Sequence, residues 1–240
     1  MKRIGMVTAG ALSFALVACG TSEQDKMAFN RVAEGSREGA EANAPLAPAD
    51  PASRLLAAAE PFEQLTETAF TDPPATLDRT ITLGRDAITA IRSILAPAVA
   101  GRIDGLLDEI ADHRKTERRA DLALSSIEIY RELVSAVPSA TKVPADVSLL
   151  DYAGFRFQAD LKAAPVRWDD MAKAAAFGRE RWTAVAPKVR DQAVTAPFEA
   201  ALRDMERAAA GRDSALAASA ATAELDLVDK LEAYFAAQGT

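Results

Sequence analysis

Side chains that commonly act as catalytic bases or nucleophiles are scarce in this chain of 240 residues, which contains one histidine and one cysteine. The histidine, His113, stands among charged residues, a setting that predicts a solvated turn. Ile110 stands three residues before it, so the chain lacks the Glu-x-x-His pair with which some helix bundles hold metal ions. We therefore expect no catalytic residue, no metal site and no cofactor, and we expect that the protein is not an enzyme.

A run of carboxylates is the first pattern that could bind a ligand. Asp104, Asp108 and Asp112 recur every four residues and would form an acidic stripe along one helix face. Like charges at this spacing repel, so a compensating group is possible, either a cation or Arg203 and Arg207 from a facing helix. A plain solvated face needs no such group and is the preferred interpretation.

Aromatic residues form the second pattern, concentrated between residues 152 and 182 together with Arg156 and Arg179. Phe157 and Trp182 fall on apolar helix faces and are expected in the core, whereas Tyr152, Phe155 and Phe177 fall off those faces. The candidate pocket or groove residues are Tyr152, Phe155, Arg156, Phe177, Arg179 and Trp182. Packing in the core, or between the two halves of the fold, is the preferred role for the same side chains.

The composition favours helices that position these residues. Alanine supplies 54 residues and glycine only 12, and aromatic residues make up 6% of the chain. Alanine is the best helix former, and strands favour aromatic and β-branched residues, so we expect an all-α fold. The net charge of −7 argues against nucleic-acid binding, which requires a basic surface.

The N-terminus has the pattern of a secretory signal. Lys2 and Arg3 precede a mostly apolar run over residues 4–17, which is too short to span a bilayer. The run leads into Leu16-Val17-Ala18-Cys19. This motif resembles the lipobox of bacterial lipoproteins. The resemblance implies that residues 1–18 are removed and that Cys19 carries several acyl chains, enough for stable membrane anchoring.

The residue after Cys19 and the segment beyond it suggest where the protein is located and how it is tethered. Gly20 is compatible with sorting to the outer membrane, because in enterobacteria-like sorting an aspartate there would retain the protein in the inner membrane. Residues 19–52 carry the lipidated cysteine and then mix Ala, Glu, Gly, Asn and Pro without an apolar period. We interpret them as a flexible tether in the periplasm.

Two similar series of residues suggest an internal duplication. The first series repeats at spacings of four and three residues, as on one helix face: Leu77, Ile81, Gly84, Ile88, Ile91 and Leu95. The second lies 94 residues later with a glycine at the same place: Met171, Ala175, Gly178, Trp182, Val185 and Val189. We predict a helical bundle built from two multi-helix halves, residues 53–137 and 147–237, joined by a loop at 138–146.

Two functions fit this organisation. The first is an interaction or scaffold protein of the bacterial envelope, anchored to the membrane through Cys19 and binding an envelope protein partner. The second is a periplasmic carrier that binds a small apolar ligand or a metal between its two helical halves. A ligand retained through purification would favour the carrier.

Overall fold

The computed structural model describes residues 50–138 and 141–238, and all of them belong to one compact unit. The predicted signal peptide, Cys19 and the predicted tether up to residue 49 lie outside the described residues. The described part of the chain is all-α and contains no strand, which confirms the predicted fold class. Its helices are α2 (Pro51–Thr68), α3 (Pro74–Ile91), α4 (Pro97–Lys115), α5 (Arg119–Ser135), α6 (Ala145–Leu161), α7 (Trp168–Val185), α8 (Gln192–Gly211) and α9 (Ser214–Ala237).

Local sequence signals explain where several helices begin. Asp50 accepts a hydrogen bond from the backbone N–H of Ser53 at 3.0 Å, and Pro51 occupies the first helical position of α2, where its missing N–H costs nothing. Asp213 caps α9 by accepting the backbone N–H groups of Ala215 and Leu216, each at 3.0 Å. Both capped helices begin immediately after an aspartate.

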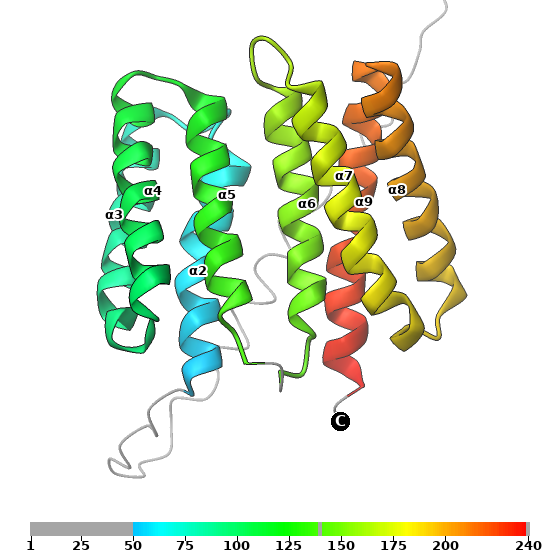
Figure 1. Cartoon of the computed structure of the whole chain (residues 1–240), viewed down its shortest axis with the longest axis horizontal. Coiled ribbons are helices and arrows are strands. Elements are labelled where there is room, and N and C mark those ends of the chain that lie inside the picture. Colours follow the sequence, from blue (N-terminus) through cyan, green and yellow to red (C-terminus); the bar gives the residue numbers. More distant parts are fainter. Residues whose placement is uncertain (1–49, 139–140, 239–240) are drawn as a thin grey trace, which may run out of the picture. The chain divides into compact units, whose positions relative to one another are not determined.

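The helices pack in two groups of four (Figure 1). In the first group α2 packs against α3 and α5, and α4 packs against α5. In the second group α6 packs against α7 and α9, and α8 packs against the same two helices. Each group surrounds its own apolar core. The packing of α5 against α6 joins the two groups in the middle of the row.

The two groups share a detail of geometry around α3 and α7, the helices that carry the two similar series of residues. Helix α3 is followed by a 3₁₀ turn at Arg92–Ile94, and α7 by a 3₁₀ turn at Ala186–Lys188, so both pairs of elements have the same lengths and are offset by 94 residues. Gly84 and Gly178 are both buried where another helix approaches closely. A Cβ on Gly84 would lie 2.8 Å from Cζ of Phe62, and one on Gly178 would lie 3.2 Å from Cβ of Ala153. Close helix packing therefore accounts for both glycines, and the internal duplication stays a prediction.

Within the described ranges, none of the helices combines the length and the apolar character needed to cross a bilayer.

Candidate functional site

The alternative in which the acidic stripe pairs with Arg203 and Arg207 is wrong. Helices α4 and α8, which carry the two sets, lie at opposite ends of the row in Figure 1. Asp104 pairs with Arg92 at 2.5 Å and Asp112 pairs with Arg118 at 2.5 Å. The two arginines find their partners within α8 itself, since Arg203 lies 3.9 Å from Glu199 and Arg207 lies 2.5 Å from Asp204. The stripe is thus a partly exposed face with local ion pairs.

His113 does not lie in a turn, as its charged neighbours had predicted. It lies in the last helical turn of α4, which continues to Lys115. Charged residues are common near helix ends, so their density around His113 gave no reliable signal for a loop.

The six aromatic and arginine candidates do not converge on one site. Trp182 is buried in the core of the second group, stacked on Phe198 with ring centroids 4.4 Å apart, and its indole N–H donates to Glu199. Arg179 binds the same Glu199 at 2.6 Å and Glu206 at 2.9 Å, both on α8. These two candidates therefore hold α7 against α8.

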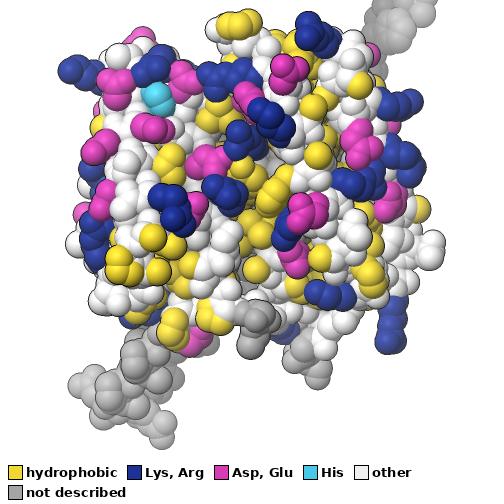
Figure 2. Space-filling view, viewed as in Figure 1, with side chains coloured by type: hydrophobic (Ala, Val, Ile, Leu, Met, Phe, Trp, Pro, Cys, Tyr) yellow, Lys and Arg dark blue, Asp and Glu magenta, His cyan; other side chains and the backbone are white. Residues whose placement is uncertain are grey.

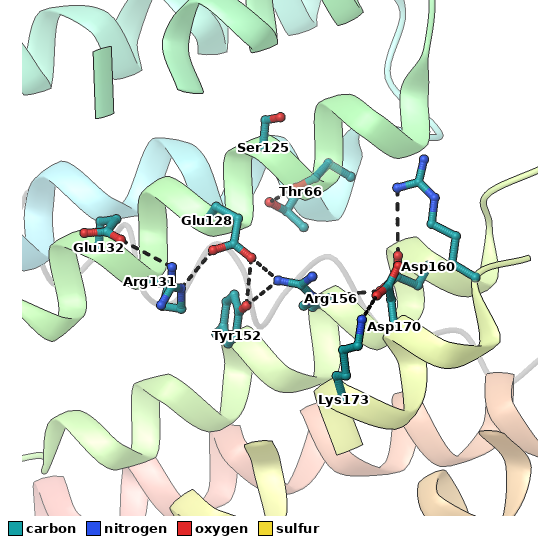
Figure 3. A network of polar contacts seen from close by, with 12 residues as sticks. Thr66, Ser125, Glu128, Arg131, Glu132, Tyr152, Arg156, Asp160, Asp170 and Lys173 are labelled. Atoms are coloured by element: carbon teal, nitrogen blue, oxygen red, sulfur yellow. Dashed lines mark hydrogen bonds and ion pairs between the residues drawn. The ribbon is translucent and has the colours of Figure 1, made fainter. Parts of the chain in front are cut away.

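Two other candidates, Tyr152 and Arg156, form a polar connection between the halves (Figure 3). Glu128 on α5 accepts hydrogen bonds from the hydroxyl of Tyr152 at 2.7 Å and from the guanidinium of Arg156. Arg131 reaches the same carboxylate at 2.8 Å. Phe177 packs edge-to-face on Tyr152 with centroids 5.1 Å apart. Burial raises the pKa of Tyr152 to about 12, so its hydroxyl remains a donor.

Every charged group in this connection has a partner of opposite sign. Asp160 at its end is 1% exposed and lies 3.9 Å from both Arg156 and Arg167, and burial raises its pKa to about 6. Figure 2 shows the same balance over a wider surface, where basic and acidic side chains alternate across one face of the molecule. The connection is best explained as a clamp between α5 and α6.

Acidic side chains predominate between α2, α6 and α9, where they line most of a cavity of about 280 Å³. Its lining residues are Glu63, Glu67, Asp151, Phe155, Gln158, Thr222, Leu225, Asp226 and Asp229. Five of these nine carry carboxyl groups, and among the described residues no lysine or arginine lines the cavity. Phe155 is the one predicted candidate that lines this cavity.

Asp151 is the most unusual of these acids. It is only 6% exposed, and its carboxyl makes no hydrogen bond or ion pair with any residue that the structure describes. Burial raises its pKa well above the usual range, and the carboxyls of Glu232 and Glu63 raise it further. Burying a charge without a partner is costly, so this environment favours the neutral form of Asp151, and a cation in the cavity would favour the charged form.

Neighbouring carboxyls respond to the same environment. Burial raises the pKa of Glu63 to about 7, and Glu232 is the largest contributor among the nearby charges. Burial also raises the pKa of Glu232 itself. A positive charge in the cavity would favour the charged forms of both carboxyls and lower their pKa.

Glu224 on α9 is a further buried acid, and it lies next to Gly154 of α6. It is fully buried, and neither carboxylate oxygen has a hydrogen-bond partner among the described residues. Burial raises its pKa well above the usual range. A Cβ on Gly154 would lie 2.1 Å from Oε2 of Glu224, so glycine at this position of α6 makes room for the carboxyl.

Sequence reasoning missed this acidic cavity because its walls come from helices far apart in the chain. A local signal was present for Asp151, which interrupts the otherwise apolar or aromatic run Leu149–Ala153. Acidic residues three or four positions apart also recur in α2 (Glu60, Glu63, Glu67) and in α9 (Asp226, Asp229, Glu232). Nothing in the sequence indicated that these two acidic faces would flank α6.

Across residues 50–138 and 141–238, no three His, Cys, Asp or Glu side chains are grouped as a metal ion would require. Comparison with known proteins gives no relative: no protein-family model, curated protein or solved structure matches this chain.

Proposed function

We propose that this protein is a lipid-anchored carrier of the bacterial envelope that binds a small organic cation in the acidic cavity. The single observation that supports this ligand is Asp151, a buried carboxyl without a partner on a cavity lined by four other acids. The anchor rests on the resemblance of Leu16-Val17-Ala18-Cys19 to a lipobox. We prefer the carrier to the scaffold hypothesis because Asp151 supplies it with a specific residue.

The chemistry of the lining favours an organic cation over an apolar ligand. An apolar molecule would leave Asp151 unpaired, whereas an ammonium group would supply both a charge and hydrogen-bond donors. Phe155 and Leu225 offer apolar surface beside the acids, which suits the hydrocarbon part of an amine. The cavity volume of about 280 Å³ leaves room for such a molecule.

A calorimetric titration tests the proposal. The full chain, purified in a nonionic detergent, is titrated with n-butylammonium chloride at pH 8. We expect saturable binding that Asp151→Asn weakens at least tenfold, which corresponds to about 1.4 kcal/mol. Asp86→Asn is the matched control, because Asp86 is an exposed carboxyl on α3 and does not line the cavity.

Two results of this titration would overturn the proposal. One is the absence of n-butylammonium binding by a wild-type protein whose circular dichroism spectrum shows it to be folded. The other is equal weakening of binding by Asp151→Asn and Asp86→Asn, which would mean that the overall charge of the protein, and not Asp151, determines the affinity. A parallel titration with CaCl₂ distinguishes a metal ligand, since tighter calcium binding that depends on Asp151 would contradict an organic cation.

A further inference from the structure

A second cavity of about 260 Å³ lies next to the first, and Glu63 lines both. Its lining residues are Leu56, Ala59, Glu60, Glu63, Tyr130, Val137, Thr141, Val143, Ala145, Ser148 and Glu232. As in the first cavity, the described lining includes acids but no lysine or arginine.

The spacing of the lining residues shows that the two cavities follow one continuous strip of each helix. On α6 the lining positions of both cavities are separated by three or four residues, the spacing of a single helix face: Ala145, Ser148, Asp151, Phe155 and Gln158. With a rise of 1.5 Å per residue, this face runs for roughly 20 Å. Helices α2 and α9 contribute lining residues to both cavities as well. The two cavities share Glu63 and follow one face of α6, and we refer to them together as the groove.

The second end of the groove has its own acidic centre. Glu232 accepts a hydrogen bond from the hydroxyl of Ser148 at 3.5 Å, and Ser148 interacts in turn with Tyr130. Tyr130 is 4% exposed, and Ser148 lies one helical turn from Asp151 on α6. Glu60 adds a second carboxyl at this end. A positive charge placed here would thus meet carboxylates and a buried pair of hydroxyls.

Resting on the proposed function, we infer that the ligand is a linear diamine or longer polyamine that occupies both ends of the groove. One ammonium group would bind at Asp151 and another at Glu232. The hydrocarbon chain between them would pass Glu63. Apolar side chains at both ends, Phe155 in the first cavity and Leu56 in the second, suit the methylene groups.

Charge matching supports a ligand with more than one positive charge. Seven acidic residues line the two cavities together: Glu60, Glu63, Glu67, Asp151, Asp226, Asp229 and Glu232. A single ammonium would leave most of this acidic surface unbalanced. Two or more ammonium groups on one chain reduce the repulsion at both ends and lose translational freedom only once.

Comparing diamines with monoamines of the same length tests the inference. The full chain in detergent is titrated at 150 mM NaCl, which screens long-range attraction, with 1,4-diaminobutane, 1,6-diaminohexane, n-butylamine and n-hexylamine. We expect at least one diamine to bind at least tenfold more tightly than its monoamine. Glu232→Gln should remove this advantage, and Asp86→Asn should leave it unchanged.

The outcomes separate the inference from the function on which it rests. Monoamine binding at Asp151 without a diamine advantage would overturn the two-ended groove and leave the carrier proposal intact. A diamine advantage that survives Glu232→Gln would also overturn it. Failure of every amine to bind would refute the carrier proposal itself.

Discussion

Replacement of Gly154 by alanine should destabilise the fold at the contact between α6 and α9. An added Cβ would lie 2.1 Å from Oε2 of Glu224, 2.8 Å from Cδ2 of Leu225 and 2.9 Å from its Cγ. Such distances are too short to persist, so α9 must move away from α6 or both side chains must leave their positions. Overpacking of this kind costs about 1–3 kcal/mol, and two simultaneous clashes place Gly154→Ala at the upper end.

The helix propensity of alanine offsets part of this cost. Alanine is favoured over glycine within a helix by about 1 kcal/mol, which leaves a net destabilisation of about 2 kcal/mol. For a folded unit of this size each kcal/mol lowers Tm by about 2–4 °C, so we expect a decrease of about 4–8 °C. Thermal unfolding of the full chain followed by circular dichroism measures this shift.

Gly101→Ala is the control. Gly101 is an exposed helical residue of α4, and nothing lies within 4 Å of an added Cβ. Only the propensity gain applies there, so this variant should be more stable than the wild type by up to about 1 kcal/mol. Equal or greater stability of Gly154→Ala relative to the wild type would refute the packing of α6 on α9 described above.

Four further substitutions should change the stability of the fold by amounts that depend on how buried each side chain is. Burial raises the pKa of Glu63 from 4.5 to about 7, so between these pH values the folded state binds more protons than the unfolded state. The stability of the fold should therefore decrease as pH rises through this range. Glu63→Gln should reduce the dependence of Tm on pH, measured from pH 5 to pH 8. Glu128→Gln removes the charge that binds Tyr152 and Arg156 and should cost about 1.5–3 kcal/mol in urea unfolding, and no loss would contradict the clamp role. The Arg203→Ala and Arg207→Ala variants should each change stability by less than about 0.5 kcal/mol, because both arginines are mostly exposed.

The helical class and the helix faces could be predicted because their signals are local. Four residues of the first series are buried on α3 as their spacing indicated: Leu77, Gly84, Ile88 and Ile91. Trp182, expected in the core because it falls on an apolar face, is fully enclosed. A periodic apolar pattern identifies the buried side of a helix whichever helix covers it.

The identity of the covering helix could not be predicted, and the candidate site depends on it. The alternative in which Asp104 faces Arg203 assumed that equivalent helices of the two halves pack together, whereas α5 and α6 make the junction. The aromatic cluster was dispersed for the same reason. Phe155 and Arg156 are adjacent in sequence, but they point toward the acidic cavity and toward Glu128 respectively.

A crystal structure of the full chain grown with 1,4-diaminobutane tests the central claim most directly. The account predicts ligand density between α2, α6 and α9, with an ammonium nitrogen within about 3 Å of a carboxylate oxygen of Asp151. An amine bound on another surface, with the carboxyl of Asp151 left unpaired at a ligand concentration that saturates the protein in solution, would contradict it.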